Sequence, residues 1–227
     1  MALPLTQQTV LITGASSGIG AALAQALAGQ FPGIRLEQFA VNLFGPLALT
    51  RALIPTMRNQ GGGRIINISS LGGRLAFPFV GVYSASKFAL EALSDVLRME
   101  LDPFNIRVSL VEPGPVATEF VDVAKMQIDA AIPNPPDTPY RAAFQKVVNL
   151  DQQLARQAWS AEQVATAIVK ALSDRHPRPR YIAATGSKLL LFVMSLLPTR
   201  LVNRFWQRFY GIDLVTKAWQ SKTQSNP

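Results

Sequence analysis

An α/β fold, with helices on both faces of a parallel sheet, is the fold class that this sequence predicts. Apolar runs rich in β-branched residues stand at 9–13, 64–68 and 106–111, and each is typical of a buried parallel strand. Segments of helical composition or periodicity separate them, and this alternation is typical of a three-layer α/β/α architecture. The chain has 227 residues, of which 48% are hydrophobic, so it can bury a substantial core.

A glycine-rich turn, G-A-S-S-G-I-G, follows the first apolar run, Thr9–Thr13, and a strong helix former, A-A-L-A-Q-A-L-A, comes next. Strand, glycine turn and helix in that order indicate a dinucleotide-binding site. Gly14 permits the tight turn, Gly18 lets the backbone approach a pyrophosphate, and Gly20 lets the helix pack on the strand. The N-terminus of the helix would then face the phosphates. A glycine turn alone indicates a dinucleotide-binding site only weakly. The segments further along the chain strengthen this interpretation.

Tyr83 and Lys87 have the i,i+4 spacing that places two side chains on one face of a helix, here predicted at Gly81–Leu101. A free phenol titrates at about pH 10, and a neighbouring ammonium lowers that pKa enough for proton transfer near neutral pH. Ser70, after the preceding strand, can hydrogen-bond a carbonyl or alkoxide oxygen. The three residues indicate proton transfer at an alcohol oxygen, although the same spacing also occurs in solvated pairs and Ser-Ser also occurs in ordinary caps.

Four segments resemble the short-chain dehydrogenase/reductase family, and they occur in the family's order. They are T-G-A-S-S-G-I-G at 13–20, N-I-S-S at 67–70, Y-S-A-S-K at 83–87 and P-G-P-V-A-T at 113–118. The resemblance covers residue 5 to about residue 185 and implies a Rossmann-type doubly wound parallel sheet. It also implies an NAD(P)-dependent oxidoreductase that transfers a hydride between nicotinamide and a carbonyl or secondary alcohol.

The resemblance assigns roles to individual residues. It implies a catalytic tetrad of Asn42, Ser70, Tyr83 and Lys87, in which the asparagine supports a water molecule beside the lysine. Outside this family, Asn42 would be a polar residue tolerated in a helix. The implied cofactor-binding residues are Gly14, Ser16, Ser17, Gly18, Ile19, Gly20, Tyr83, Lys87, Pro113, Gly114, Val116 and Thr118. Thr118 matches the family residue that bonds the nicotinamide amide.

The sequence departs from the family after the first strand–turn–helix unit. A block of about seventy residues is missing near 36/37, before a long helix predicted at Glu37–Asn59. The sheet is therefore expected to be incomplete, with central strands missing. The residue that reads the cofactor ribose belongs to this block, so NAD and NADP both stay open, with NADP slightly favoured. The alternative function is a catalytically impaired or inactive truncated relative that acts as a membrane-surface or dimerising protein.

The remaining segments complete a predicted catalytic domain at 1–185. Residues 119–159 have weak periodicity and a proline-rich patch, and they match the family's variable substrate lid in position. Ser160–Leu172 is a predicted helix opened by S-A-E-Q, the pattern of a capping box. Arg180–Ala184 is the predicted last strand.

The apolar face of Gly81–Leu101 (Phe88, Leu90, Leu93, Val96 and Leu97) is expected in the core or in a dimer interface.

Residues 186–227 form a predicted basic tail. Residues 175–227 hold nine Lys or Arg and one acidic residue, Asp213, and so carry the entire net charge of +8. Arg200, Arg204 and Arg208 recur every fourth residue beside an apolar stripe, which is typical of an amphipathic helix lying on an anionic membrane. Packing of that helix on the domain or on a second subunit is the alternative. The apolar run at 188–197 is too short to span a bilayer.

Composition excludes several other functions. There is no cysteine, and the single histidine, His176, stands in R-H-P-R-P-R as a predicted solvated turn residue, so no metal site is expected. No groove-reading motif indicates nucleic acid. No signal peptide is visible at the N-terminus, and a cytoplasmic protein is expected, with peripheral membrane contact through 188–210 as an open alternative. The expected partners are a small, lipophilic carbonyl or alcohol substrate and further copies of the chain.

Overall fold

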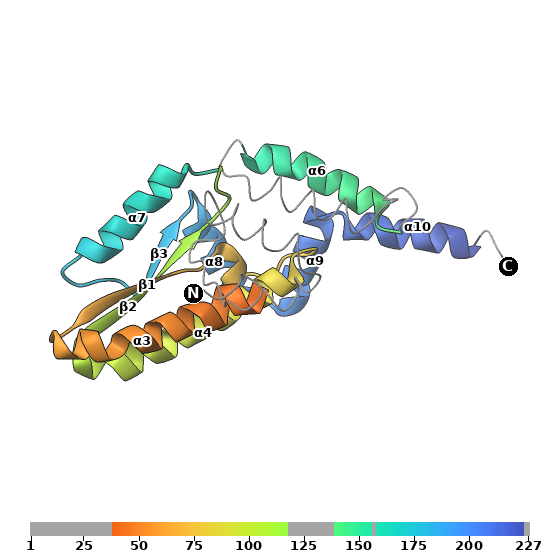
Figure 1. The fold of residues 1–227 in the computed structure, drawn as a ribbon. Helices are drawn as coiled ribbons and strands as arrows, with labels where there is room; N and C mark the ends of the chain where they lie inside the picture. The colour runs from red at the N-terminus through yellow and green to blue at the C-terminus, as the bar shows by residue number, and fades with distance from the viewer. Residues whose placement is uncertain (1–37, 118–138, 156–157, 225–227) are drawn as a thin grey trace, which may run out of the picture.

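The computed structural model describes residues 38–117, 139–155 and 158–224, and a parallel sheet flanked by helices lies toward one end of it (Figure 1). The predicted strand and glycine turn at 9–20 lie outside the described residues. Thr118 and most of the proline-rich patch lie outside them as well.

The sheet has three described strands, β1 (Gly63–Ile68), β2 (Ile106–Pro113) and β3 (Arg180–Ala183), in the order β1-β2-β3. All pairings are parallel, with Ile65 opposite Val108 and Val111 opposite Tyr181. Each strand forms where an apolar run predicts it, and β2 continues two residues further to include Glu112 and Pro113. Within the described ranges β1 pairs only with β2. The predicted α/β fold class is confirmed, and three strands are consistent with an incomplete sheet.

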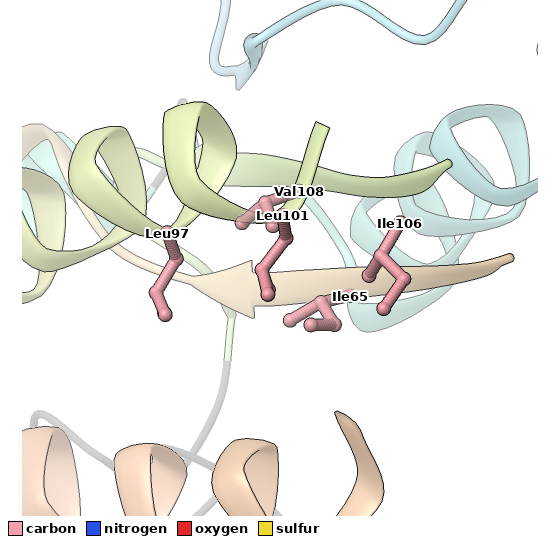
Figure 2. Packing of buried hydrophobic residues seen from close by; sticks show 5 residues of the cluster. All are labelled: Ile65, Leu97, Leu101, Ile106 and Val108. Atoms are coloured by element: carbon pink, nitrogen blue, oxygen red, sulfur yellow. The ribbon is translucent and has the colours of Figure 1, made fainter. Parts of the chain in front are cut away.

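Two helices cover one face of this sheet (Figure 1). The π-helical turn η2 (Ala40–Phe44) leads into α3 (Gly45–Asn59), which contains Pro55 near its end, and α4 spans Gly81–Leu101. Alternate strand residues point to these helices because side chains alternate between the two faces of a strand. Figure 2 shows the resulting cluster, made of Ile65, Leu97, Leu101, Ile106 and Val108. The helices predicted at 37–59 and 81–101 are therefore present, and their apolar sides bury the sheet.

The opposite face is covered by α7 (Ala161–Ser173). Its N-terminus has the predicted capping box: the Ser160 hydroxyl accepts from the Gln163 amide at 3.3 Å, and the Gln163 side chain accepts from the Ser160 amide at 2.8 Å. Two of the four unpaired amides of the first helical turn are thus satisfied, which fixes where α7 begins. The cluster beneath α7 consists of Val111, Val164, Ala171, Tyr181 and Ala183.

Four more helices lie beyond one end of the sheet (Figure 1). They are α6 (Arg141–Ala155), α8 (Ser187–Leu196), α9 (Thr199–Phe209) and α10 (Ile212–Gln224). Helix α6 lies within 119–159, the segment that matches the family's variable substrate lid in position and in which the sequence predicts no helix. None of the helices in the described ranges is long and apolar enough to cross a bilayer.

The C-terminal helices share a core with the loop that follows β1. Leu71 and Leu75 from that loop pack with Leu191 and Met194 of α8 and with Trp206 of α9. Trp206 is buried and makes an edge contact with Phe77 at 4.8 Å between ring centroids. One side of α9 therefore packs on the rest of the structure. This is one of the two arrangements that the sequence left open for the tail.

Candidate active site

The carboxyl ends of β1 and β2 lie side by side because the two strands are parallel. Ser69 and Ser70 follow β1, and the Pro113-Gly114 turn closes β2. Ser70 caps the short turn η3 (Leu71–Gly73), its hydroxyl accepting a hydrogen bond from the Gly72 amide at 3.0 Å. Ligands of open α/β sheets bind at this edge, so the position of Ser70 suits a substrate-binding hydroxyl.

Tyr83 lies in the first turn of α4 and reaches back to Ser70. The two side chains are hydrogen-bonded, which lowers the pKa of Tyr83, but burial acts more strongly and leaves that pKa above its ordinary value. This direction is opposite to the lowering predicted from the sequence. The physical reason is desolvation: the partly buried phenol loses water that would otherwise stabilise a phenolate.

Gly72 keeps the space between these two side chains free. A Cβ atom at Gly72 would lie 3.2 Å from Tyr83 Cε1 and 3.4 Å from the Ser70 hydroxyl oxygen. The first distance is tighter than an ordinary van der Waals contact. The Ser70–Tyr83 geometry therefore depends on a residue without a side chain at position 72.

Lys87 lies one helical turn after Tyr83 and is buried. Its ammonium donates to the carbonyl oxygen of Ile68 at 3.0 Å and lies 5.8 Å from the centroid of the Tyr83 ring. Burial lowers the pKa of Lys87 to about 8, and the negative charge of Glu91 partly opposes this change. Lys87 is thus still mostly protonated at pH 7, with two N–H donors left over from the bond to Ile68.

Asn42 contacts the same helix, but through a serine. Its side-chain amide donates to the Ser86 hydroxyl at 3.0 Å, and that hydroxyl donates to the backbone carbonyl of Tyr83 at 2.7 Å. Asn42 therefore holds the segment that carries Tyr83 and Lys87. The water-mediated link from Asn42 to Lys87 stays a prediction.

The Pro113-Gly114 turn packs tightly against the end of β3. A Cβ atom at Gly114 would lie 2.7 Å from the Cβ of Ala184, so only glycine fits there without displacement. Val116 forms an isolated bridge with Trp159.

The other predicted cofactor-binding residues lie outside the described residues, and their cofactor roles stay predictions. They are Gly14, Ser16, Ser17, Gly18, Ile19, Gly20 and Thr118. The described half of the site, with a buried ammonium beside a phenol and a close-packed glycine turn, fits the nicotinamide ribose end of a dinucleotide.

Four charged residues next to this site have no role in the sequence prediction. Arg74, Glu91, Glu112 and Arg180 form a connected set of ion pairs at the carboxyl end of β2. One local signal does exist: Glu112 interrupts the apolar run Ile106–Val111 directly before the Pro-Gly turn. The pairing itself joins segments far apart in the chain, so local patterns do not reveal it.

The family model for short-chain dehydrogenases matches residues 35–128. A probable short-chain type dehydrogenase/reductase of Helicobacter pylori, VdlC, is 36% identical over 169 residues, which are 72% of this chain and 58% of that protein. A 3-ketodihydrosphingosine reductase of Bacteroides thetaiotaomicron is 33% identical over 204 residues, which are 89% of this chain and 73% of that protein.

The chain belongs to the short-chain dehydrogenase/reductase family. It spans less than two thirds of the length of VdlC, and the family match begins close to the join predicted near 36/37. Among solved structures, a short-chain dehydrogenase/reductase from Burkholderia phymatum in complex with NAD superposes with a TM-score of 0.53 and 26% identity. That superposition covers 68% of this chain and 54% of the other. The family membership and the Rossmann-type fold are thus established on both sequence and structure.

Proposed function

We propose that the protein is an NAD(P)-dependent oxidoreductase that interconverts a carbonyl group and a secondary alcohol. The observation that carries this proposal is the arrangement of Ser70, Tyr83 and the buried Lys87 at the carboxyl edge of the sheet. A phenol, a hydroxyl and an ammonium within one small site supply a proton donor, an oxygen ligand and a fixed positive charge.

In the reducing direction, Tyr83 gives its phenolic proton to the carbonyl oxygen of the substrate. Ser70 donates its hydroxyl proton in a hydrogen bond to the same oxygen, while one of its lone pairs accepts from the Gly72 amide. Lys87, protonated at neutral pH, stabilises the phenolate left on Tyr83 and has donors available for a ribose hydroxyl. When bound, the nicotinamide supplies the hydride for reduction or accepts it in oxidation. In the oxidising direction, the phenolate of Tyr83 takes the proton back.

Replacing Tyr83 by Phe tests this assignment because it removes the proton donor and keeps the ring. We expect kcat for carbonyl reduction to fall by a factor of about a hundred or more. Tyr140→Phe is the matched control, since Tyr140 is an exposed aromatic residue outside the site. Equal kcat values in the two variants would contradict the proposed role of Tyr83.

A lipophilic substrate is part of the proposal. It is supported by the Bacteroides relative, whose name gives 3-ketodihydrosphingosine as its substrate. It is also supported by the apolar cluster of Leu71, Leu75 and Trp206, which begins directly after Ser70. Activity on long-chain ketones that exceeds activity on short, polar ketones would bear it out.

A catalytically impaired relative is the second candidate. The observation that favours it is the edge of β1, which has no strand neighbour on the side away from β2 in the described part of the chain. Such a relative would keep the Ser-Tyr-Lys arrangement and fail to bind dinucleotide. Cofactor binding therefore separates the two candidates.

We also propose that the protein forms homo-oligomers and contacts membranes at its periphery. Apolar side chains on α3 and α4 stay exposed, among them Leu53, Phe88 and Val96, and a second copy would cover them. Light scattering coupled to gel filtration tests this, with a monomer mass as the contradicting result. The membrane contact would use the exposed faces of α8 and α9, which are a separate surface.

A further inference from the structure

The Ser70 loop runs from Ser69 to Arg74 and is held to β2 at both of its ends. At its start, the backbone amide of Ser69 donates to the carbonyl oxygen of Val111 at 2.8 Å. At its end, a guanidinium nitrogen of Arg74 donates to Glu112 Oε1 at 3.3 Å. Val111 and Glu112 are consecutive residues of β2, so both ends of the loop are fixed to the same short piece of this strand.

Glu112 is itself fixed in position by β3 and α4. It is fully buried, and Arg180 of β3 forms an ion pair of 3.1 Å with its Oε1 atom. Arg180 is held in turn by Glu91 and Asp95 of α4, at 3.0 and 2.6 Å. A buried carboxylate needs such partners, because an ion that leaves water without a counter-charge is strongly destabilised. Arg74, whose side chain is 39% exposed, therefore reaches a fixed acceptor from the surface.

The contact of Ser70 with Tyr83 lies between these two anchors. The Ser70 hydroxyl caps the single turn η3, and the Arg74 amide closes that turn by donating to the Leu71 carbonyl oxygen at 3.0 Å. Only three residues separate Ser70 from Arg74, so a shift of the arginine is passed directly to the hydroxyl. Hydrogen bonds between hydroxyl groups weaken beyond about 3.0 Å, so a displacement of about 1 Å is enough to break this contact.

Apolar packing also holds the Ser70 loop, because Leu71 and Leu75 contact α8 and α9. The hydrophobic effect is non-directional, so this packing keeps the loop in place without fixing the position of a single hydroxyl. The contact between Arg74 and Glu112 is a charge-assisted hydrogen bond, which is stronger and has a preferred geometry. It is therefore the contact best suited to set where the end of the turn lies.

We propose that Glu112 is a positioning residue, which acts through Arg74 to hold Ser70 in contact with Tyr83. The proposal rests on the proposed function for the catalytic roles of Ser70 and Tyr83, and on the ion pairs for the path that leads to them. Loss of the pair between Arg74 and Glu112 lets Ser70 move away from the phenol. The substrate oxygen then loses one of its two hydrogen-bond donors.

The first test follows the Tyr83 phenol by NMR, in the full chain labelled with ¹³C at the tyrosine Cζ atom. Tyr83→Phe assigns the signal, and Ser70→Ala shows where it lies without the hydrogen bond. In Arg74→Gln we expect the signal to move toward its position in Ser70→Ala, and in Arg74→Lys, which keeps the charge, to stay near the wild-type position. Arg107→Gln is the matched control, because Arg107 forms an exposed ion pair with Asp102 near the opposite end of β2.

Glu112→Gln separates a displacement of Ser70 from a direct effect of charge. It removes a negative charge, whereas Arg74→Gln removes a positive one, so a direct electrostatic effect would move the Tyr83 signal in opposite directions in the two variants. Loss of the ion pair moves it in the same direction in both, which is the result we expect. If the buried Glu112→Gln does not fold, Arg74→Gln and the kinetic test below decide.

The second test asks whether Arg74 acts through Ser70. We expect kcat for carbonyl reduction to fall about tenfold in Arg74→Gln, because small misplacements at a reacting centre are costly. The double variant with Ser70→Ala and Arg74→Gln should be no slower than Ser70→Ala alone, since both changes remove the same interaction. A general structural role of Arg74 would instead give losses that multiply.

An unchanged Tyr83 signal in folded Arg74→Gln would overturn the proposal, as would an equal change in Arg107→Gln or multiplying losses of kcat. Signals that move in opposite directions in Arg74→Gln and Glu112→Gln would overturn it as well. The NMR measurement does not depend on turnover. The expected displacement in a chain that binds no dinucleotide would support the positioning by Glu112 and reject only the proposed function.

Discussion

Burial governs the protonation of both ionisable residues at the centre of the site. It raises the pKa of Tyr83 and lowers the pKa of Lys87 to about 8, so in both residues burial shifts the equilibrium toward the neutral form. The Ser70 hydroxyl and the Glu91 carboxylate oppose these changes only in part. At neutral pH the site therefore holds a phenol and an ammonium, which is the protonation state that carbonyl reduction requires.

The lowered pKa of Lys87 predicts a rise in stability with pH. A free lysine titrates at about pH 10.4, so between pH 8 and 10 the unfolded chain binds more protons at this residue than the folded one. The free energy of unfolding should then increase by about 2 kcal/mol between pH 8 and 9.5 through Lys87. Urea denaturation at these two values measures it. In Lys87→Met the increase should vanish, and an equal increase in both proteins would show that other groups cause it.

The contact between Ser70 and Tyr83 is predicted to depend on the absence of a side chain at Gly72. Gly72→Ala places a methyl group 3.2 Å from Tyr83 Cε1 and should displace the phenol from Ser70. We expect kcat/KM to fall about tenfold or more, because small misplacements at a reacting centre are costly. Gly81→Ala is the control, since a Cβ atom there meets nothing within 4 Å. A Gly72→Ala variant as active as Gly81→Ala would contradict this account of the Ser70–Tyr83 contact.

At the scale of elements, α8 and α9 each have a buried side and an exposed apolar side. Met194 and Trp206 face the core, whereas Leu189, Phe192 and Leu196 of α8 are exposed by 69%, 62% and 68%. On α9 the exposed Arg204 and Arg208 line an open groove together with Leu201, Phe205 and Phe209. Residues 187–211 contain no Asp or Glu to offset the arginines. Apolar side chains beside uncompensated cations suit an anionic lipid surface.

This surface predicts salt-dependent binding to vesicles that contain anionic lipids. Each arginine near such a surface contributes about 1 kcal/mol, so Arg204→Gln should weaken sedimentation with these vesicles roughly fivefold. Phe192→Gln should weaken it as well, and Arg141→Gln, on the exposed side of α6, should not. Binding that is equal for zwitterionic and anionic vesicles, or absent from both, would reject the membrane contact.

At the scale of the whole molecule, the sheet, the site loop and the C-terminal helices form one connected structure. Ser70 lies at the start of the loop after β1. Leu71 and Leu75 of the same loop pack against α8 and α9. Arg180 joins β3 to α4 and β2 on the other side of the site. Residues outside the predicted catalytic domain, such as Trp206, therefore support the geometry of residues within it.

Local chemistry made a large part of this structure predictable. The bounds of α4, the capping box at Ser160 and the three described strands each follow from residues that are neighbours in the sequence. The closeness of Ser70 and Tyr83 came from the family resemblance rather than from spacing. The upward direction of the Tyr83 pKa was missed because it depends on burial, which a sequence motif does not report.

Long-range contacts account for what the sequence did not reveal. Helix α6 packs against a distant part of the chain near Gly211, where a Cβ atom would lie 3.4 Å from the Ala143 Cα. The ion pairs of Arg180 join residues that are far apart along the chain. The partial burial of α9 likewise depends on a loop that precedes it by more than a hundred positions.

Cofactor binding by the protein of this sequence tests the oxidoreductase proposal. NADPH and then NADH are titrated into the purified, folded chain, and the nicotinamide fluorescence is followed. We predict saturable binding with a dissociation constant in the micromolar range for at least one of the two. A folded chain that binds neither cofactor would contradict the oxidoreductase proposal and favour the impaired relative.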